Sequence, residues 1–264
     1  MVCVYSSIMT TIVDNLQAVH ARIAAACAAC GRDPFSVRLL AVSKTFGPEA
    51  VIEALSGGQS AFGENYIQEG VEKILAVRRW EADGLRLSSS RHSFALRSPP
   101  LAGPLFSPSE WHCIGPIQSN KTRLVAENFD WVQSVDRLKI AQRLSEQRPP
   151  QLPPLQVCLQ VNIDGGVSKS GVSPQDALAL AEEVARLPRL QLRGLMSIPE
   201  PAIDFVAACV IHKRAADLFD EINAAGVLPQ PMDTLSMGMS ADLEAAVHAG
   251  STMVRVGTAL FGVR

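Results

Sequence analysis

The sequence predicts an α/β protein folded as a single (β/α)8 TIM-type barrel with an extra N-terminal helix. Short apolar runs alternate with amphipathic segments along the 264 residues, and this favours a parallel sheet because parallel neighbours need helical crossovers. Eight repeats in about 250 residues match the size of a closed barrel. An open doubly wound sheet is the alternative, but it usually carries a Gly-rich fingerprint after its first strand. No such fingerprint follows Val42, so we expect one barrel domain over residues 1–264.

The elements can be placed in order along the chain. A first helix is predicted from Thr11 to Cys30, where Gly31 ends it. The apolar runs after it are strand candidates, at residues 37–43, 60–63, 111–114, 131–135, 155–163, 190–198, 234–237 and 253–257. The amphipathic segments between them are helix candidates, at residues 48–55, 66–77, 121–129, 137–147, 174–187, 202–225 and 241–249.

One segment interrupts this alternation. Residues 78–109 are rich in Arg, Ser, Leu and Pro and lack a steady period. A structureless loop of this length is uncommon inside a compact domain, so we interpret the segment as a flexible insertion. It follows a helix and precedes a strand, which places it at the N-terminal face of the barrel, away from the usual active-site face.

Charge and composition exclude several classes of function. The formal net charge is −2, so no global positive field favours nucleic acid or acidic lipid. No run approaches the roughly 18 apolar residues of a membrane span, and no Lys or Arg precedes Arg22, unlike the charged start of a signal peptide. Cys27 and Cys30 form a C-x-x-C pair without a second pair to complete a zinc site. We therefore expect a cytoplasmic protein with no metal site.

Lys44 is the most informative single residue. It follows the apolar run 39–42 directly, at the carboxyl end of a buried strand and hence at the face where barrels carry their active sites. Partial desolvation there favours the neutral amine that attacks an aldehyde to form a Schiff base. The alternative is a strand-end lysine whose amine reaches into water.

The last two strands end in loops suited to a phosphate, since barrels often bind one there. These loops supply hydroxyls from Ser236, Ser240 and Thr258, a glycine at Gly257 that lets the backbone approach, and free helix N–H groups. The alternatives are a plain helix N-cap for Ser240 and a strand-ending turn for Gly257.

Arg255 lies two residues before Gly257, on the same face of the last strand. An arginine directed into a barrel needs a partner, and the candidates are a ring nitrogen of a cofactor or the carboxylate of Glu64. Asn65 either binds a cofactor hydroxyl or caps the next helix. His112, inside the third strand, is expected to be a hydrogen-bonded structural residue rather than an acid or base.

Six stretches, in order along the chain, resemble a known family. They are LLAVSKT at 39–45, AFGENYIQEG at 61–70, WHCIGPIQSNKTRLVAE at 111–127, VNIDGGVSKSG at 161–171, RGLMSIP at 193–199 and LSMGMSADLEAAVHAGSTMVRVGTALFG at 235–262. On these motifs the chain resembles the proteins that bind pyridoxal 5′-phosphate (PLP) and serve in PLP, or vitamin B6, homeostasis (the YggS/PROSC family). Residues 78–109 have no counterpart in that resemblance.

The resemblance implies a barrel of the alanine-racemase N-terminal type that binds PLP as a Schiff base on Lys44. The other residues it implies around the cofactor are Ser236, Ser240, Gly257 and Thr258 at the phosphate, Arg255 at the pyridine nitrogen, and Asn65 and Met196 in the pocket wall. Two departures are visible. Many relatives carry a second lysine where this chain has Phe46, and relatives often begin near Met9, so residues 1–8 are interpreted as an N-terminal extension.

The main hypothesis is a non-catalytic protein that buffers or delivers PLP inside the cell, with PLP-dependent apo-enzymes as candidate recipients. The alternative is an amino-acid racemase of the alanine-racemase type. Racemisation needs a base on each face of the substrate carbon; in such racemases a tyrosine from a β-rich second domain supplies one. This chain ends at Arg264, and neither Tyr5 nor Tyr66 can come from such a domain. We therefore expect a carrier that is a monomer. A third class, a phosphate-binding barrel without PLP, would be indicated by a colourless protein that cannot be reconstituted.

Overall fold

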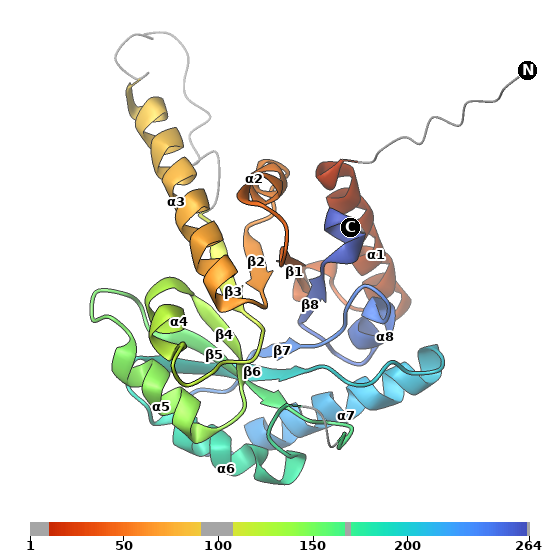
Figure 1. Ribbon diagram of the computed structural model, residues 1–264. Coiled ribbons are helices and arrows are strands. Elements are labelled where there is room, and N and C mark those ends of the chain that lie inside the picture. The colour runs from red at the N-terminus through yellow and green to blue at the C-terminus, as the bar shows by residue number, and fades with distance from the viewer. Residues whose placement is uncertain (1–10, 91–107, 167–169, 263–264) are drawn as a thin grey trace, which may run out of the picture.

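The computed structural model describes residues 11–90, 108–166 and 170–262. Eight parallel strands pair in chain order and close into one barrel, as Figure 1 shows. The strands are β1 (Arg38–Val42), β2 (Ala61–Glu64), β3 (Glu110–Cys113), β4 (Trp131–Val135), β5 (Leu155–Val161), β6 (Leu190–Ser197), β7 (Thr234–Ser236) and β8 (Met253–Val256). The predicted closed barrel is confirmed, and the open sheet is excluded.

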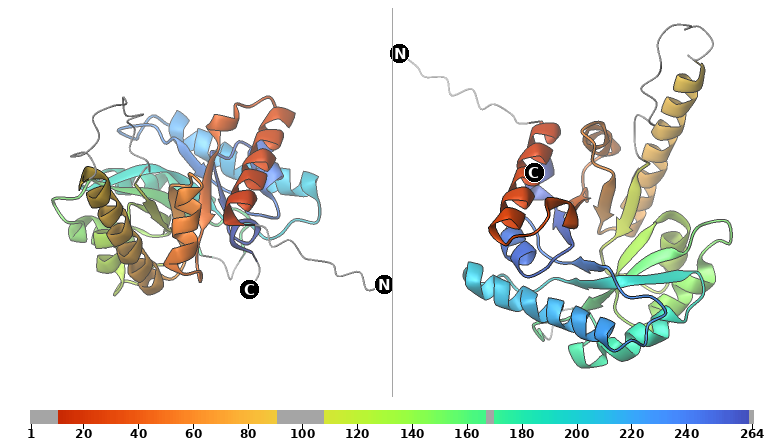
Figure 2. Two further views of the ribbon diagram at one scale, coloured as in Figure 1. Left: turned by 90° about the horizontal axis from the view of Figure 1, so that it is seen from above. Right: turned by 180° about the vertical axis from the view of Figure 1, so that it is seen from behind.

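Helices cover the outside of the barrel (Figure 2). They are α1 (Ile12–Ala29), the 3-10 turn η1 (Pro34–Ser36), α2 (Pro48–Ser56), α3 (Ile67–Ser90), α4 (Thr122–Asn128), α5 (Leu138–Gln147), α6 (Pro174–Ala185), α7 (Phe205–Ala224), α8 (Leu243–His248) and α9 (Thr258–Phe261). None of the helices in the described ranges has the length and apolarity that crossing a membrane requires.

Local sequence explains where several elements begin. Thr11 and Asp14 form a capping box at the start of α1, each side chain accepting the other's backbone N–H. Ser173 caps α6, and Pro174 occupies its first position, where a missing N–H costs nothing. In β1 the run Leu39–Val42 is buried throughout, as expected for a parallel strand that has helices on one side and the barrel interior on the other.

The predicted start of the irregular insertion is wrong. Helix α3 continues to Ser90, so residues 78–90 are helical rather than structureless. Val77 is fully buried and Trp80 packs against the core, but the residues from Ala82 to Gly84 are exposed. This part of α3 extends beyond the barrel (Figure 1). Its sequence lacks the regular spacing of apolar residues from which a helix is predicted. Residues 91–107 and 1–8 lie outside the described ranges, so a flexible insertion and an N-terminal extension stay predictions.

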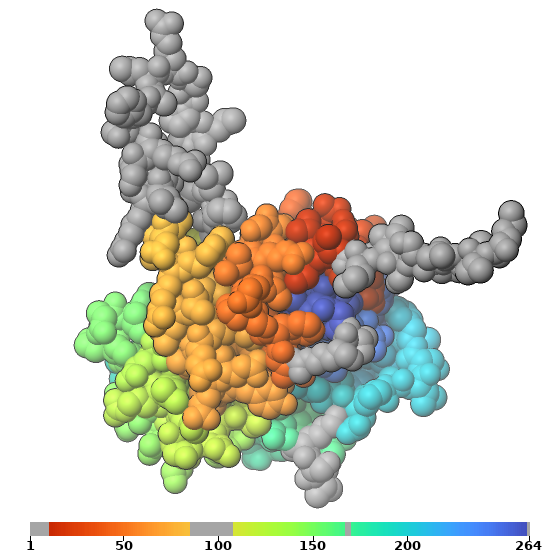
Figure 3. Space-filling model, turned by 45° about the horizontal axis from the view of Figure 1, so that its top comes forward, coloured from red at the N-terminus to blue at the C-terminus, as the bar shows by residue number. Residues whose placement is uncertain are grey.

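The two ends of the described chain meet on one side of the barrel. Helix α1 packs against α8 and α9, and Asn15 Nδ2 donates a hydrogen bond to the carbonyl of Leu260 over 2.8 Å. Figure 3 shows the same arrangement on the surface, where the C-terminal residues in blue lie beside α1 in red. The extra N-terminal helix is therefore part of the barrel wall.

We expect Gly194→Ala to lower the free energy of unfolding by about 3 kcal/mol or more, because overpacking against backbone is poorly relieved. A Cβ at this position of β6 would lie 1.6 Å from the carbonyl oxygen of Thr234 on β7. Gly84→Ala in α3 is the control, since nothing lies within 4 Å of its Cβ position; there alanine should stabilise by about 1 kcal/mol. Urea unfolding measures both, and a Gly194 variant as stable as the control would contradict the close β6–β7 approach.

Candidate active site at the C-terminal mouth of the barrel

Strand pairing brings the predicted site residues to one end of the barrel. β8 lies beside β1 with Leu40 opposite Arg255, and β1 lies beside β2 with Val42 opposite Gly63. Residues that follow these three strands, Lys44, Asn65 and Gly257, therefore share one mouth although they are far apart in sequence. β6 and β7 complete the same side, with Met196 opposite Ser236.

The turn after β1 presents Lys44 to the mouth. Thr45 has a φ of 70°, a left-handed conformation that costs a β-branched residue about 1–3 kcal/mol. The Glu69 carboxylate accepts the backbone N–H of Thr45 and helps hold the turn. Ser43 is fully buried whereas Lys44 is exposed. The partial desolvation expected for Lys44 is therefore not observed, because the residue after the buried Ser43 is exposed.

A second lysine, which sequence reasoning missed, lies buried beneath this turn. Lys73 Nζ, from α3, donates to Glu64 Oε1 over 2.6 Å and to the carbonyl of Ser43 over 2.7 Å. Ser43 Oγ donates to the same carboxylate oxygen. Burial raises the pKa of Glu64 above its ordinary value, while the charge and hydrogen bond of Lys73 oppose that rise. The ion pair anchors the residue that precedes Lys44.

Several buried polar atoms in the described residues have no hydrogen-bond partner. Two of them, Asn65 Oδ1 and Ser197 Oγ, belong to residues at the carboxyl ends of β2 and β6. Asn65 therefore does not cap α3 through its side-chain oxygen, which was the alternative to cofactor binding. Gly115 lies so close that a Cβ there would be 2.0 Å from the carbonyl oxygen of Asn65. Buried polar atoms normally have partners, so the two orphaned oxygens mark a place for a polar ligand.

Arg255 points into the barrel, where it is almost fully buried. Its Nη1 donates to Ser236 Oγ and its Nη2 to the carbonyl of Ser197, each over 2.8 Å. Glu64, the carboxylate partner weighed from the sequence, is instead bonded to Lys73. Burial lowers the pKa of Arg255 to about 10, against the opposing charge of Asp242, so the guanidinium is charged at neutral pH.

The residues predicted around a phosphate differ in their burial. Ser240 is half-buried, and it is not the N-cap of α8, a position that belongs to Asp242. Thr258 is exposed at the start of α9, after Gly257, where a Cβ would lie 3.1 Å from the carbonyl oxygen of Val42. Ser236 lies deeper, fully buried, with its hydroxyl bonded to Arg255 and Gln133. A phosphate contact by Ser236 therefore stays a prediction.

Met196 is also deeper than the rim. It is fully buried and clusters in the barrel interior with Trp131 and Cys158. Its predicted place in the pocket wall stays a prediction.

Side chains from two outer helices brace the β7–α8 loop. Arg22 of α1 donates from Nη2 to the carbonyl of Ser240 over 3.0 Å and pairs with Glu244 of α8. His212 of α7 lies 2.9 Å from Asp242 through its Nε2, and Asp242 Oδ1 accepts the backbone N–H of Met239. No pattern in the sequence indicated these contacts, because they join segments that are distant along the chain.

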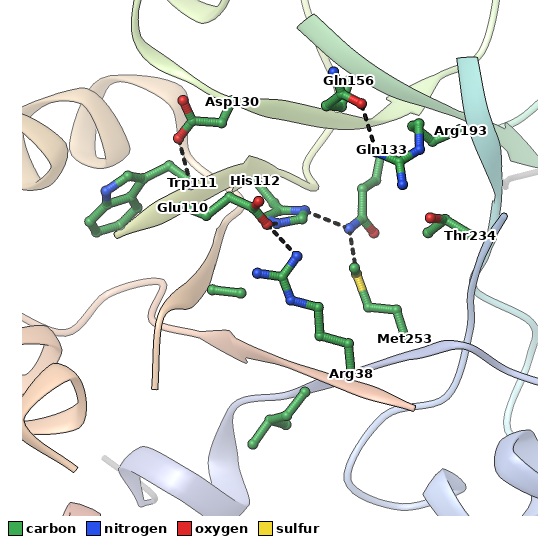
Figure 4. Close-up of polar contacts among 12 residues, drawn as sticks. Arg38, Glu110, Trp111, His112, Asp130, Gln133, Gln156, Arg193, Thr234 and Met253 are labelled. Carbon is green, nitrogen blue, oxygen red and sulfur yellow. Dashed lines mark hydrogen bonds and ion pairs between the residues drawn. The ribbon is translucent and has the colours of Figure 1, made fainter. Parts of the chain in front are cut away.

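His112 lies away from the mouth, on the side where the strands begin (Figure 4). It is fully buried, stacks on Trp131, and hydrogen-bonds Glu110 through Nε2 and Gln133 through Nδ1. The expected hydrogen bonding of His112 is confirmed, and its structural rather than acid–base role stays a prediction.

Comparison with known proteins places this barrel and its mouth in a defined class. The model of the family described as alanine racemase, N-terminal domain, matches residues 15–264. The pyridoxal phosphate homeostasis protein of Vibrio cholerae is 52% identical over 97% of this chain and 98% of its own length. PipY of Synechococcus elongatus, solved with PLP bound, is 31% identical, with 96% of this chain and 100% of PipY covered and a TM-score of 0.74. The chain belongs to the family of pyridoxal phosphate homeostasis proteins.

The likeness to racemases themselves is more distant. An alanine racemase of Clostridium difficile has a TM-score of 0.65 but only 14% identity, with 95% of this chain and 57% of the racemase covered. That comparison shows a shared fold and nothing about the reaction.

Lys73→Met should lower the free energy of unfolding by about 3–5 kcal/mol, since it leaves the buried Glu64 carboxylate without its cation. The double variant Glu64→Gln/Lys73→Met should recover part of that loss, because no buried charge remains. Lys139→Met, at an exposed position of α5, is the matched control and should have little effect. Chemical denaturation measures all three; equal stability of Lys73→Met and Lys139→Met would show that the pair contributes nothing.

Proposed function

We propose that this protein binds PLP at the C-terminal mouth of its barrel and buffers or delivers the cofactor. The observation that carries the proposal is the geometry of the mouth. An accessible lysine, Lys44, follows the strand that pairs with β8, and β8 carries the buried cation Arg255. A lysine amine for the aldehyde and an arginine for the pyridine ring are the two groups that PLP needs at its opposite edges.

The residues present fit this cofactor. Lys44 Nζ would bind the aldehyde carbon, and Arg255 would donate toward the pyridine nitrogen. The orphaned Asn65 Oδ1 and Ser197 Oγ would receive polar edges of the ring. Ser240, Gly257 and Thr258 would hold the phosphate, with loop hydroxyls and a close backbone approach. These last three and Lys44 are all at least partly exposed, as an entry face requires. Bound PLP supplies an electron sink for carbanions.

A non-catalytic role is favoured over racemisation. Racemisation needs a base on each side of the substrate carbon. His112, a residue type that could act as a base, is buried and hydrogen-bonded to Glu110 and Gln133, away from the mouth. The named relatives are homeostasis proteins, and their role in PLP homeostasis supports the carrier proposal. Delivery to PLP-dependent apo-enzymes, a cytoplasmic location and a monomeric state remain predictions.

Lys44→Ala should abolish the adduct that borohydride traps between PLP and the protein, because no other amine is expected to reach the aldehyde carbon. Peptide mass spectrometry locates the adduct in the unsubstituted protein. Lys139→Ala is the control, since it removes another exposed amine, from helix α5, that is not part of the proposed site, and it should leave the adduct unchanged. An adduct of equal yield in Lys44→Ala, for example on Lys73, would assign the cofactor to a different lysine.

The carrier proposal predicts no exchange of α-hydrogens in amino acids. PLP-loaded protein in heavy water, mixed with a panel of L- and D-amino acids, should leave the α-proton NMR signals unchanged, because in a carrier Lys44 holds the cofactor and does not remove a proton from an amino acid. Exchange that depends on Lys44 would instead show an enzyme. Exchange that persists in Lys44→Ala at the rate of free PLP would reflect the cofactor in solution, and so provides the baseline.

A further inference from the structure

A chain of hydrogen bonds crosses the barrel interior, from the proposed cofactor side to the opposite rim. Arg255 Nη1 lies 2.8 Å from Ser236 Oγ, which lies 2.7 Å from Gln133 Oε1. Gln133 Nε2 lies 2.9 Å from His112 Nδ1, and His112 Nε2 lies 2.7 Å from Glu110 Oε1. Figure 4 shows the second half of this chain, from Gln133 through His112 to Glu110. The five side chains come from β8, β7, β4 and β3.

The two ends, together with the orientation of the Gln133 amide, determine the direction of every bond in between. A guanidinium can only donate, and an ionised carboxylate can only accept. Ser236 must therefore accept from Arg255 and give its own proton to Gln133 Oε1. Gln133 then turns its Nε2 toward His112, which accepts at Nδ1 and carries its single ring proton on Nε2, where Glu110 accepts it. One arrangement of protons satisfies the whole chain.

Burial makes this arrangement obligatory, because water cannot replace a lost partner. Ser236, Gln133 and His112 are all fully buried. The second amide hydrogen of Gln133 faces Met253 Sδ at 3.1 Å, and the His112 ring stacks on Trp131 with 5.0 Å between centroids. A protonated His112 would direct an N–H at the Gln133 amide nitrogen, so the charged ring does not fit the chain.

The charged groups around His112 come from several elements. Glu110 lies on its own strand, Arg38 of β1 pairs with Glu110 over 2.7 Å, and Asp130 lies just before β4. Arg193 of β6 covers the Trp131 ring on which His112 stacks. Burial lowers the pKa of His112, while the hydrogen bond and charge of Glu110 oppose that effect. The same hydrogen bond helps hold the pKa of Glu110 at about 2, although burial alone would raise it.

We propose that Gln133 and His112 are positioning residues for Arg255. They orient the Ser236 hydroxyl, which accepts a hydrogen bond from the Arg255 guanidinium. This orientation requires a neutral His112 with its proton on Nε2. The orientation of the arginine at the C-terminal mouth is thereby set from the opposite side of the barrel. The proposal rests on the proposed function for one point, that the ligand of Arg255 is PLP. The hydrogen bonds that orient Arg255 are present in the structure without the cofactor.

Three variants of the full-length protein test this proposal. Gln133→Leu removes both the acceptor for Ser236 and the donor to His112. Gln133→Glu keeps an acceptor for Ser236 but places a second acceptor at His112 Nδ1. Gln156→Leu is the control, because Gln156 lies on neighbouring β5, bonded to Arg193 and outside the chain. Nitrogen-15 NMR of the His112 ring and the Arg255 guanidinium is recorded without PLP, and retention of PLP is then measured by dialysis.

We expect the unsubstituted protein to show the Nε2–H form of His112 throughout pH 6–8. Gln133→Leu should shift the Arg255 signals and weaken PLP retention about five-fold, the usual effect of one lost hydrogen bond. Gln133→Glu should keep the Arg255 signals and PLP retention close to those of the unsubstituted protein, while His112 becomes doubly protonated at neutral pH. Gln156→Leu should change none of these readouts.

A proton on His112 Nδ1, or a charged ring at pH 7 in the unsubstituted protein, would overturn the proposal. So would Arg255 signals that move no more in Gln133→Leu than in Gln156→Leu. If the NMR results are as expected but the unsubstituted protein retains no PLP, the positioning of Arg255 stands and the proposed function fails.

Discussion

The pairing of β8 with β1 is the interaction on which the rest of this structure depends. It joins the last strand to the first over Arg38–Ala41 and Met253–Val256 and so closes the sheet into a barrel. Closure leaves no unpaired strand edge and sends all eight carboxyl ends to one mouth. Lys44 and the Gly257 loop, more than two hundred residues apart, become neighbours only through this pairing, and the close approach of Gly257 to Val42 follows from it.

Closure also creates a barrel interior that contains polar as well as apolar side chains. Arg255, Ser236, Gln133 and His112 face that interior, and each finds its partner among the others or on Glu110. Buried polar groups destabilise a protein when unpaired, but a fully bonded set specifies one arrangement. The polar interior thus connects the two faces of the barrel, the mouth with Lys44 and the rim with Glu110.

Side chains of helices outside the barrel contact and support the loops at the mouth. Helix α1 reaches the β7–α8 loop through Arg22 and the α9 turn through Asn15, the two segments proposed to hold a phosphate. Helix α3 reaches beneath Lys44 through Lys73. Loops that bind ligands need a rigid support, and here helices from the first third of the chain supply it to loops at both ends of the sequence.

The sequence by itself determined the order of the elements. Strands and helices differ in the spacing of their apolar residues, and this spacing can be read within a short stretch of sequence. It also determined that Lys44 follows the carboxyl end of a buried strand. The tertiary structure alone decided which side chains meet. Arg255 rests on Ser236 and Ser197 rather than Glu64, and Lys73 takes Glu64, because these contacts depend on strand register and helix packing, which no local pattern encodes. The length of α3 was likewise missed because the sequence after Val77 has no steady apolar period, although the helix continues to Ser90.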